Sequence, residues 1–147
     1  YFDCHQDVSV DHSSLSTSIF GIVACDIVYL DEAYKYFSQS ARMDLDDYHN
    51  NFYAGIHAAN MAGTWQAIVN GFAGVRCQNG VLKFKPTIPK EWKEYAFRLK
   101  FKGALLEVRI TKDKAEFTLL EGGEISFTVR GKEVVLKSGE TYTYLLS

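Results

Sequence analysis

The chain has 147 residues, of which 47% are hydrophobic and 23% are charged, and this composition is typical of a globular protein rather than a disordered one. Its net charge of −2 gives no electrostatic reason to bind nucleic acid or an anionic membrane, so neither partner is expected. The three cysteines, Cys4, Cys25 and Cys77, lack the pair spacing of a metal site. They indicate free thiols in a reducing compartment, and a cytoplasmic location is expected.

The sequence divides near residue 79 into two parts of different composition. Residues 1–78 hold nine acidic and three basic residues, whereas residues 79–147 hold nine acidic and thirteen basic residues. All four histidines lie in the first part. The chain also begins with Tyr1 instead of methionine, so we expect it to be a part of a longer protein.

Three helices are predicted in the first part. The first follows the capping residues at 11–14, and its apolar residues recur at helical spacing: Leu15, Ile19, Ile22, Val23 and Ile27. The second begins at Asp31 and runs to about Met43. A loop rich in aspartate follows at residues 44–51. We interpret it as a solvated loop or helix cap, because its spacing is not that of a calcium-binding loop.

The third helix is predicted from about Ala54 to Phe72, and it opens on small residues around His57. Small residues let a ligand or another backbone approach closely, and the N–H groups of a first helical turn can face an anion. A tightly packed helix with a hydrogen-bonded core histidine is the structural alternative. Three such helices alone would leave apolar surface unburied, so we expect them to end a larger helical array.

The second part alternates between apolar and polar residues, with turn signals between the alternating segments. After the Asn79-Gly80 turn, seven strands are predicted at residues 81–85, 97–102, 105–111, 115–120, 125–129, 134–136 and 141–146. Short alternating strands at this spacing predict an antiparallel β-sandwich or jelly-roll. The basic residues are spread along the strands and are not gathered with exposed aromatic residues, which is not typical of a nucleic-acid-binding surface.

Four blocks of the sequence, taken in order, resemble glycoside hydrolase family 65. They are residues 12–16 (HSSLS), 41–47 (ARMDLDD), 55–65 (GIHAANMAGTW) and 82–92 (LKFKPTIPKEW). Within that family the pattern is similar to the phosphorylases of maltose, trehalose, kojibiose or nigerose. The resemblance implies that residues 1–78 form the last helices of an (α/α)₆ catalytic barrel. It implies an antiparallel, jelly-roll-like β-sandwich domain for residues 79–147.

The resemblance also implies a reaction and a set of binding residues. An α-linked glucose disaccharide and inorganic phosphate would give β-glucose 1-phosphate and glucose with inversion, without a metal or organic cofactor. The phosphate would be bound by the hydroxyls of Ser13 and Ser14, by a ring N–H of His57 and by the backbone around Gly63. The general-acid glutamate would lie before Tyr1, so residues 1–147 alone are expected to be inactive. Dimers are common in the family, and a homodimer is expected by analogy.

Two alternatives stay open. A trehalase-like hydrolase of the same family would need a second carboxylate to activate water, and the sequence has no aspartate or glutamate between Asn50 and Gly63. A non-catalytic carbohydrate-binding or structural sandwich would need an exposed aromatic platform for sugar binding. The candidates for that platform are Trp92, Tyr95, Tyr142 and Tyr144. Their alternation with apolar neighbours favours packing instead. Asn60 stands where the resemblance implies serine, which weakens any binding role for residue 60.

Overall fold

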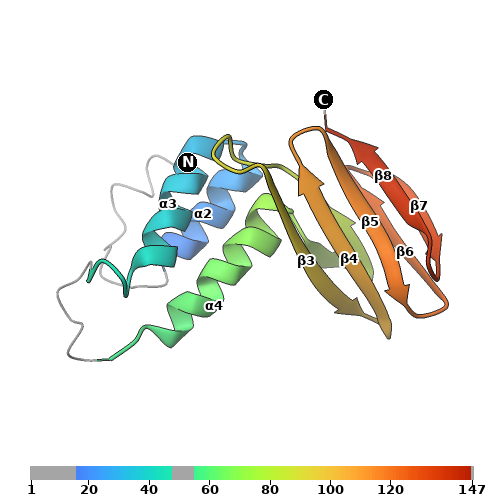
Figure 1. The fold of residues 1–147 in the computed structure, drawn as a ribbon, viewed down its shortest axis with the longest axis horizontal. Helices are drawn as coiled ribbons and strands as arrows, with labels where there is room; N and C mark the ends of the chain where they lie inside the picture. Colours follow the sequence, from blue (N-terminus) through green and yellow to red (C-terminus); the bar gives the residue numbers. More distant parts are fainter. Residues whose placement is uncertain (1–15, 48–54, 147) are drawn as a thin grey trace. The chain divides into compact units, whose positions relative to one another are not determined.

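The computed structural model describes residues 16–47 and 55–146, and the chain divides into two compact units, residues 1–71 and 72–147. The described part of the first unit contains three α-helices: α2 (Ser16–Asp26), α3 (Leu30–Arg42) and α4 (Ala58–Gln66). A π-helical segment, η2 (Ala67–Phe72), continues α4. Each pair among the three α-helices is in contact (Figure 1). The three helices predicted from the sequence are therefore confirmed.

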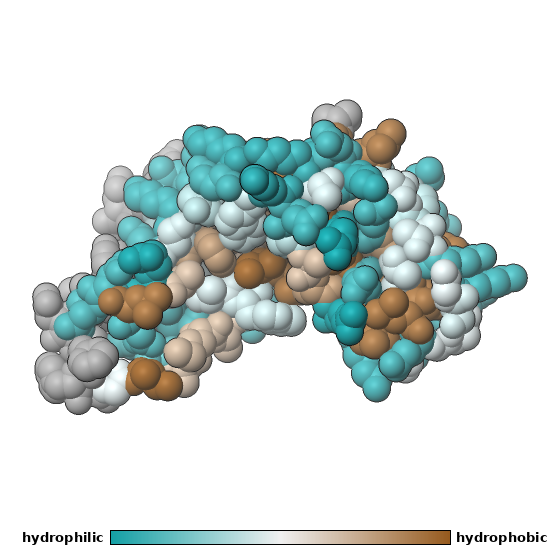
Figure 2. All heavy atoms as spheres, viewed as in Figure 1, coloured by the Kyte–Doolittle hydropathy of each residue, from teal (hydrophilic) through white to brown (hydrophobic). Residues whose placement is uncertain are grey.

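The buried face of α2 consists of small residues, although the helix was predicted from the spacing of its larger apolar residues. Its buried residues are Thr17, Ser18, Gly21, Ala24 and Cys25. The larger side chains of Ile19, Val23 and Ile27 are 52%, 39% and 41% exposed. Small side chains let helix backbones approach closely, and the large apolar residues are left on the other side. Apolar surface on the helical unit is visible in Figure 2, as expected for helices taken from a larger array.

The second unit is a β-sandwich of two four-stranded sheets. One sheet has the order β1-β2-β6-β7 and contains β1 (Arg76–Gln78), β2 (Val81–Phe84), β6 (Glu124–Val129) and β7 (Lys132–Lys137). The other has the order β3-β4-β5-β8 and contains β3 (Glu94–Phe101), β4 (Ala104–Thr111), β5 (Lys114–Glu121) and β8 (Thr141–Leu145). The seven predicted strands are all present. The short strand β1 was not predicted, and it lies on the N-terminal side of the boundary placed at residue 79.

One strand pair departs from the predicted antiparallel pattern. The strands β2 and β6 pair in parallel, with Leu82 opposite Phe127, while the other five pairs of described strands are antiparallel. The chain leaves the first sheet after β2, builds β3 to β5 of the second sheet and then returns as β6. Two strands joined by such a crossover can run in the same direction, which a two-residue hairpin does not allow.

Three hairpins fix the register of the strands. Their two-residue turns are Asn79-Gly80, Lys102-Gly103 and Arg130-Gly131, and both residues of each turn have positive φ. These are type I′ turns, whose twist matches that of paired strands. The resulting alternation points Phe84, Phe117 and Phe127 inward from β2, β5 and β6, with ring centroids 4.9 to 5.5 Å apart. Aromatic contacts between the two sheets thus form the centre of the sandwich core.

Candidate functional site

His57 occupies the N-cap position of α4, with φ −83° and ψ 69°. Its own side chain does not cap the helix, so the imidazole is engaged elsewhere. The residues that follow it are small, and the helix begins on Ala58. The sequence therefore placed His57 correctly at a helix start, where backbone N–H groups lack partners inside the helix.

The carboxylate of Asp44 holds His57 at two points. The His57 backbone N–H donates to Asp44 Oδ1 at 3.2 Å and to Oδ2 at 3.1 Å. The ring atom Nδ1 lies 2.5 Å from Oδ1. Because an ionised carboxylate can only accept, Nδ1 carries the proton in this contact. The two side chains are 19% and 21% exposed, so the pair is largely shielded from solvent.

Asp44 is kept ionised by this arrangement. The hydrogen bond from the His57 ring lowers the pKa of the Asp44 carboxyl, and the His57 backbone N–H and ring charge act in the same direction, against an opposing effect of burial. A carboxyl with a depressed pKa stabilises the fold above its ordinary pKa of about 3.9. That contribution is lost as the pH falls through the depressed value. At neutral pH the Asp44 carboxylate therefore stays ionised and accepts hydrogen bonds from His57.

A buried polar network connects α3 to α4 close to this pair. Ser40 Oγ donates to Asn60 Oδ1 at 2.7 Å, and Asn60 Nδ2 donates to the Ser40 carbonyl at 2.5 Å. Thr64 Oγ1 lies 3.0 Å from Ser40 Oγ and donates to the Asn60 carbonyl at 2.9 Å. Ser40 and Asn60 are each 2% exposed. Buried polar groups that are satisfied in this way fix the relative position of two helices, so Asn60 has a structural role.

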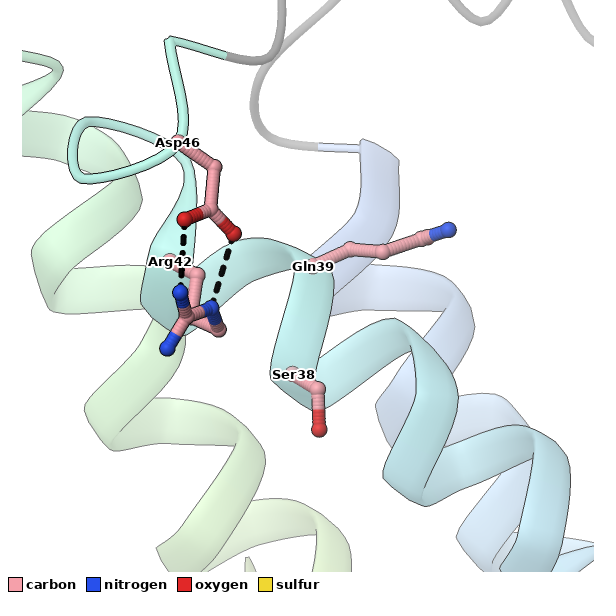
Figure 3. A pocket seen from close by; sticks show the side chains of 4 residues that line it. All are labelled: Ser38, Gln39, Arg42 and Asp46. Atoms are coloured by element: carbon pink, nitrogen blue, oxygen red, sulfur yellow. Dashed lines mark hydrogen bonds and ion pairs between the residues drawn. The ribbon is translucent and has the colours of Figure 1, made fainter.

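The turn after α3 is closed by an ion pair at the surface. Arg42 Nε and Nη2 each donate to an oxygen of Asp46 at 2.7 Å (Figure 3). This bidentate pair lowers the pKa of Asp46. Ser38 and Gln39 line a hollow of about 190 Å³ together with the pair. Because its guanidinium is already matched by a carboxylate, Arg42 is a poor candidate for binding a second anion.

A larger hollow of about 330 Å³ lies between α3 and α4. Its lining consists of Ser40, Ala41, Asp44, Leu45, Asn60, Met61 and Thr64. Leu45 and Met61 are 78% and 54% exposed, so the hollow is open to solvent at its rim. Asp44 therefore both lines this hollow and contacts His57.

Gly63 lies where α4 crosses α2. A Cβ atom placed on it would lie 2.5 Å from Ser18 Oγ and 2.9 Å from Ser18 Cβ. Such distances are far below van der Waals contact, so the helices can be this close only with glycine at this position. Packing by itself explains the glycine. The predicted approach of phosphate to the Gly63 backbone stays a prediction.

Replacing Gly63 with alanine is expected to destabilise the protein by up to about 2 kcal/mol. Overpacking costs about 1–3 kcal/mol, and the better helix propensity of alanine returns at most about 1 kcal/mol. Urea denaturation of Gly63→Ala in the wild-type and Ser18→Gly backgrounds measures the coupling. The alanine should cost clearly less in the Ser18→Gly background, where the clashing side chain is removed. Equal costs in both backgrounds would show that the Ser18 contact is unimportant.

Two of the four predicted phosphate ligands, Ser13 and Ser14, lie outside the described residues. Asp44 was not predicted as a site residue, although it belongs to the 41–47 block that carries the resemblance. The contact joins residues 13 positions apart, and an aspartate in a polar loop carries no sequence signal for such a partner. In residues 16–47 and 55–146, no group of three or more His, Cys, Asp or Glu side chains is arranged to hold a metal ion.

The candidate site lies in a helical segment that matches a known catalytic domain. Residues 1–66 match the central catalytic domain of glycosyl hydrolase family 65, and residues 75–136 match the C-terminal domain of the same family. The chain belongs to glycoside hydrolase family 65. The match and the structure confirm the prediction of catalytic-domain helices followed by a β-sandwich, and the (α/α)₆ barrel stays a prediction. The helices of the described segments are all too short or too polar to cross a membrane.

Individual members of the family align along nearly the whole chain. An α,α-trehalose phosphorylase of Thermoanaerobacter brockii is 48% identical over 95% of the chain, and a maltose phosphorylase of Bacillus subtilis is 36% identical over 92%. A solved structure from the human microbiome, provisionally assigned as a kojibiose phosphorylase, superposes on 99% of the chain with a TM-score of 0.91 and 34% identity. The chain spans only 18% of the length of the first two relatives and 21% of the third.

Proposed function

We propose that the whole protein is an inverting disaccharide phosphorylase, in which residues 1–147 supply part of the phosphate site and the C-terminal domain. The substrates are an α-linked glucose disaccharide and inorganic phosphate, and the products are β-glucose 1-phosphate and glucose. The observation that carries the proposal is His57, held by Asp44 at the start of a helix in a chain whose aligned relatives include trehalose and maltose phosphorylases. α,α-Trehalose is the first substrate to test, because the trehalose phosphorylase has the higher identity.

In this proposal the protein binds phosphate as the nucleophile and provides no base. Ser13 and Ser14 contribute hydroxyls, His57 contributes a ring N–H, and the backbone near Gly63 borders the anion. The general acid is a glutamate outside residues 1–147. An inverting hydrolase would instead use a carboxylate to activate water. Asp44 is unsuited to that role, since its oxygens already accept two N–H groups of His57 and its lowered pKa makes it a weaker base.

A carbohydrate-binding role for the sandwich has less support. Trp92 packs edge-on against Phe72 and Tyr95, with ring centroids 5.0 and 5.5 Å apart. Tyr95 donates its hydroxyl to the Thr87 carbonyl at 2.7 Å. Tyr142 lies near Phe117 in the core, with a centroid distance of 6.4 Å. These rings serve internal packing, so we propose a structural role for the sandwich domain of residues 79–147, which β1 (Arg76–Gln78) joins from the N-terminal side. The helices that precede β1 belong to the barrel in this proposal.

The remaining properties follow from the same proposal. The reaction needs no metal or organic cofactor, because phosphate is itself a substrate and the acid is a side chain. The whole protein acts in the cytoplasm, where disaccharide and phosphate are both available, and neither nucleic acid nor membrane is a partner. A homodimer is the proposed assembly.

The test is an assay of the whole protein with trehalose, maltose, kojibiose and nigerose, each with and without inorganic phosphate. Products are followed by NMR, which separates the two anomers of glucose 1-phosphate. The β anomer is expected from one disaccharide and only with phosphate. Release of two free sugars at the same rate without phosphate would make the protein a hydrolase and contradict the proposal.

A further inference from the structure

Asp44 follows the end of α3 and contacts both the backbone and the ring of His57. We propose that Asp44 is a positioning residue of the phosphate site, which fixes the His57 ring so that only Nε2 can contact phosphate. The inference rests on the proposed function, because it assigns Asp44 to the same site. Nothing in the sequence resemblance gave Asp44 a role.

The geometry fixes both the backbone and the ring of His57 with a single carboxylate. Asp44 accepts the His57 backbone N–H with both oxygens, at 3.2 and 3.1 Å, and accepts Nδ1 at 2.5 Å. The backbone contact sets where α4 begins, and the ring contact sets the rotation of the imidazole. A residue bound at only one of these points could still turn about its side-chain torsions. The double contact removes that freedom.

The position of Asp44 is itself fixed from the helix that precedes it. Met43, the residue before it, is 2% exposed and anchors the end of α3. The buried contact of Ser40 with Asn60 joins the two helices about one turn away from the pair. The Asp44–His57 contact is therefore prepared before any ligand arrives.

The chemistry of imidazole then decides which atom meets the anion. Nδ1–H is committed to the carboxylate, so a phosphate contact of this ring must use Nε2. Nε2 donates to a phosphate oxygen when the ring carries both protons, and the imidazolium then lies between two anions. Carboxylate–histidine pairs of this kind also orient the rings of metal-binding histidines. Here the oriented His57 ring would bind a phosphate oxygen instead of a metal ion.

Asp44→Asn in the whole protein tests the proposal, with Asp46→Asn as the matched control. Asparagine keeps one acceptor for Nδ1 but removes the charge, so the KM for phosphate is expected to rise about three- to thirty-fold. The KM for the disaccharide should change less than two-fold. Asp46→Asn removes a neighbouring carboxylate that contacts Arg42 rather than His57, and it should leave both constants within two-fold. A phosphate KM unchanged in Asp44→Asn would overturn the proposal.

A second measurement reads the ring directly and does not need turnover. In protein labelled with ¹⁵N-histidine, the His57 signals are those lost in His57→Ala, and the neutral ring should carry its proton on Nδ1. Asp44→Asn should shift that proton toward Nε2, whereas Asp46→Asn should not. A wild-type ring protonated only on Nε2 would overturn the positioning role, even if phosphorolysis is observed. A wild type that hydrolyses the disaccharide without phosphate contradicts the proposed function, and the ring signals would still decide how Asp44 holds His57.

Discussion

Replacing His57 with alanine is expected to raise the KM for phosphate by about 10- to 150-fold. The loss corresponds to about 1.5–3 kcal/mol for a hydrogen bond to a charged group, at 1.4 kcal/mol for each factor of ten. The KM for the disaccharide should stay close to the wild-type value, because the sugar is bound by other parts of the whole protein. Initial rates of phosphorolysis at varied phosphate and fixed disaccharide measure the effect.

Two further variants at position 57 separate the two ring nitrogens. Asparagine places an amide near the position of Nδ1, so His57→Asn can keep the contact with Asp44 but lacks the donor at Nε2. Glutamine reaches farther, and His57→Gln should recover part of the phosphate affinity. Gln66→Ala, at the exposed end of α4, is the control for changes in that helix. Wild-type phosphate affinity in His57→Asn would show that Nε2 is not the contacting atom.

The sandwich could be predicted from the sequence because the patterns that define its strands and turns lie within short segments of the chain. Strict alternation sets which residues of a strand face inward, and a turn such as Asn79-Gly80 permits positive φ at both positions. The strand β1 was missed because its three residues, Arg76–Gln78, are too few to show alternation. The parallel pairing of β2 with β6 was missed because it joins segments far apart in the chain.

The helical unit could be predicted only in part, because its packing depends on contacts between helices. The buried face of α2 is made of small residues, while a periodicity argument selects large apolar ones. Val28 lies between α2 and α3 with φ 66°. Its N–H donates to the Cys25 carbonyl and the N–H of Tyr29 donates to the Ala24 carbonyl. This is the bonding of a Schellman motif, whose left-handed residue is usually glycine. A β-branched residue gives no sequence signal for that conformation.

The candidate site, like the helical unit, could be predicted only in part. His57 was identified from the small residues around it and from the family pattern. Its partner Asp44 was not, since a polar loop dense in aspartate does not show which carboxylate turns inward. The 2.5 Å contact also changes the argument about hydrolysis. The absence of an acidic residue between Asn50 and Gly63 in sequence does not keep a carboxylate away from His57 in space.

The largest effect on stability is expected from Gly74→Ala, at about 2–4 kcal/mol. Gly74 has φ +62°, and an added Cβ would lie 2.7 Å from the Lys85 carbonyl oxygen and 2.8 Å from Lys85 Cβ. A left-handed conformation costs an alanine about 1–2 kcal/mol, and overpacking against another segment adds about 1–2 kcal/mol, in the lower part of the usual range. Backbone atoms cannot rotate away, and the Lys85 N–H is bonded to the Ala73 carbonyl at 3.1 Å. Urea or thermal unfolding measures the loss.

Gly131→Ala separates the two contributions to that loss. Gly131 also has a positive φ, +83°, but an added Cβ would meet nothing within 4 Å. Only the conformational cost applies there, so Gly131→Ala should lose about 1–2 kcal/mol and Gly74→Ala clearly more. Neither glycine lies in the helices that carry the proposed phosphate site, so the folded fraction of each variant should keep the wild-type KM for phosphate. Equal losses of stability at the two positions would mean that the segment around Lys85 yields to the added methyl group. The close approach at Gly74 would then contribute nothing to holding the sandwich together.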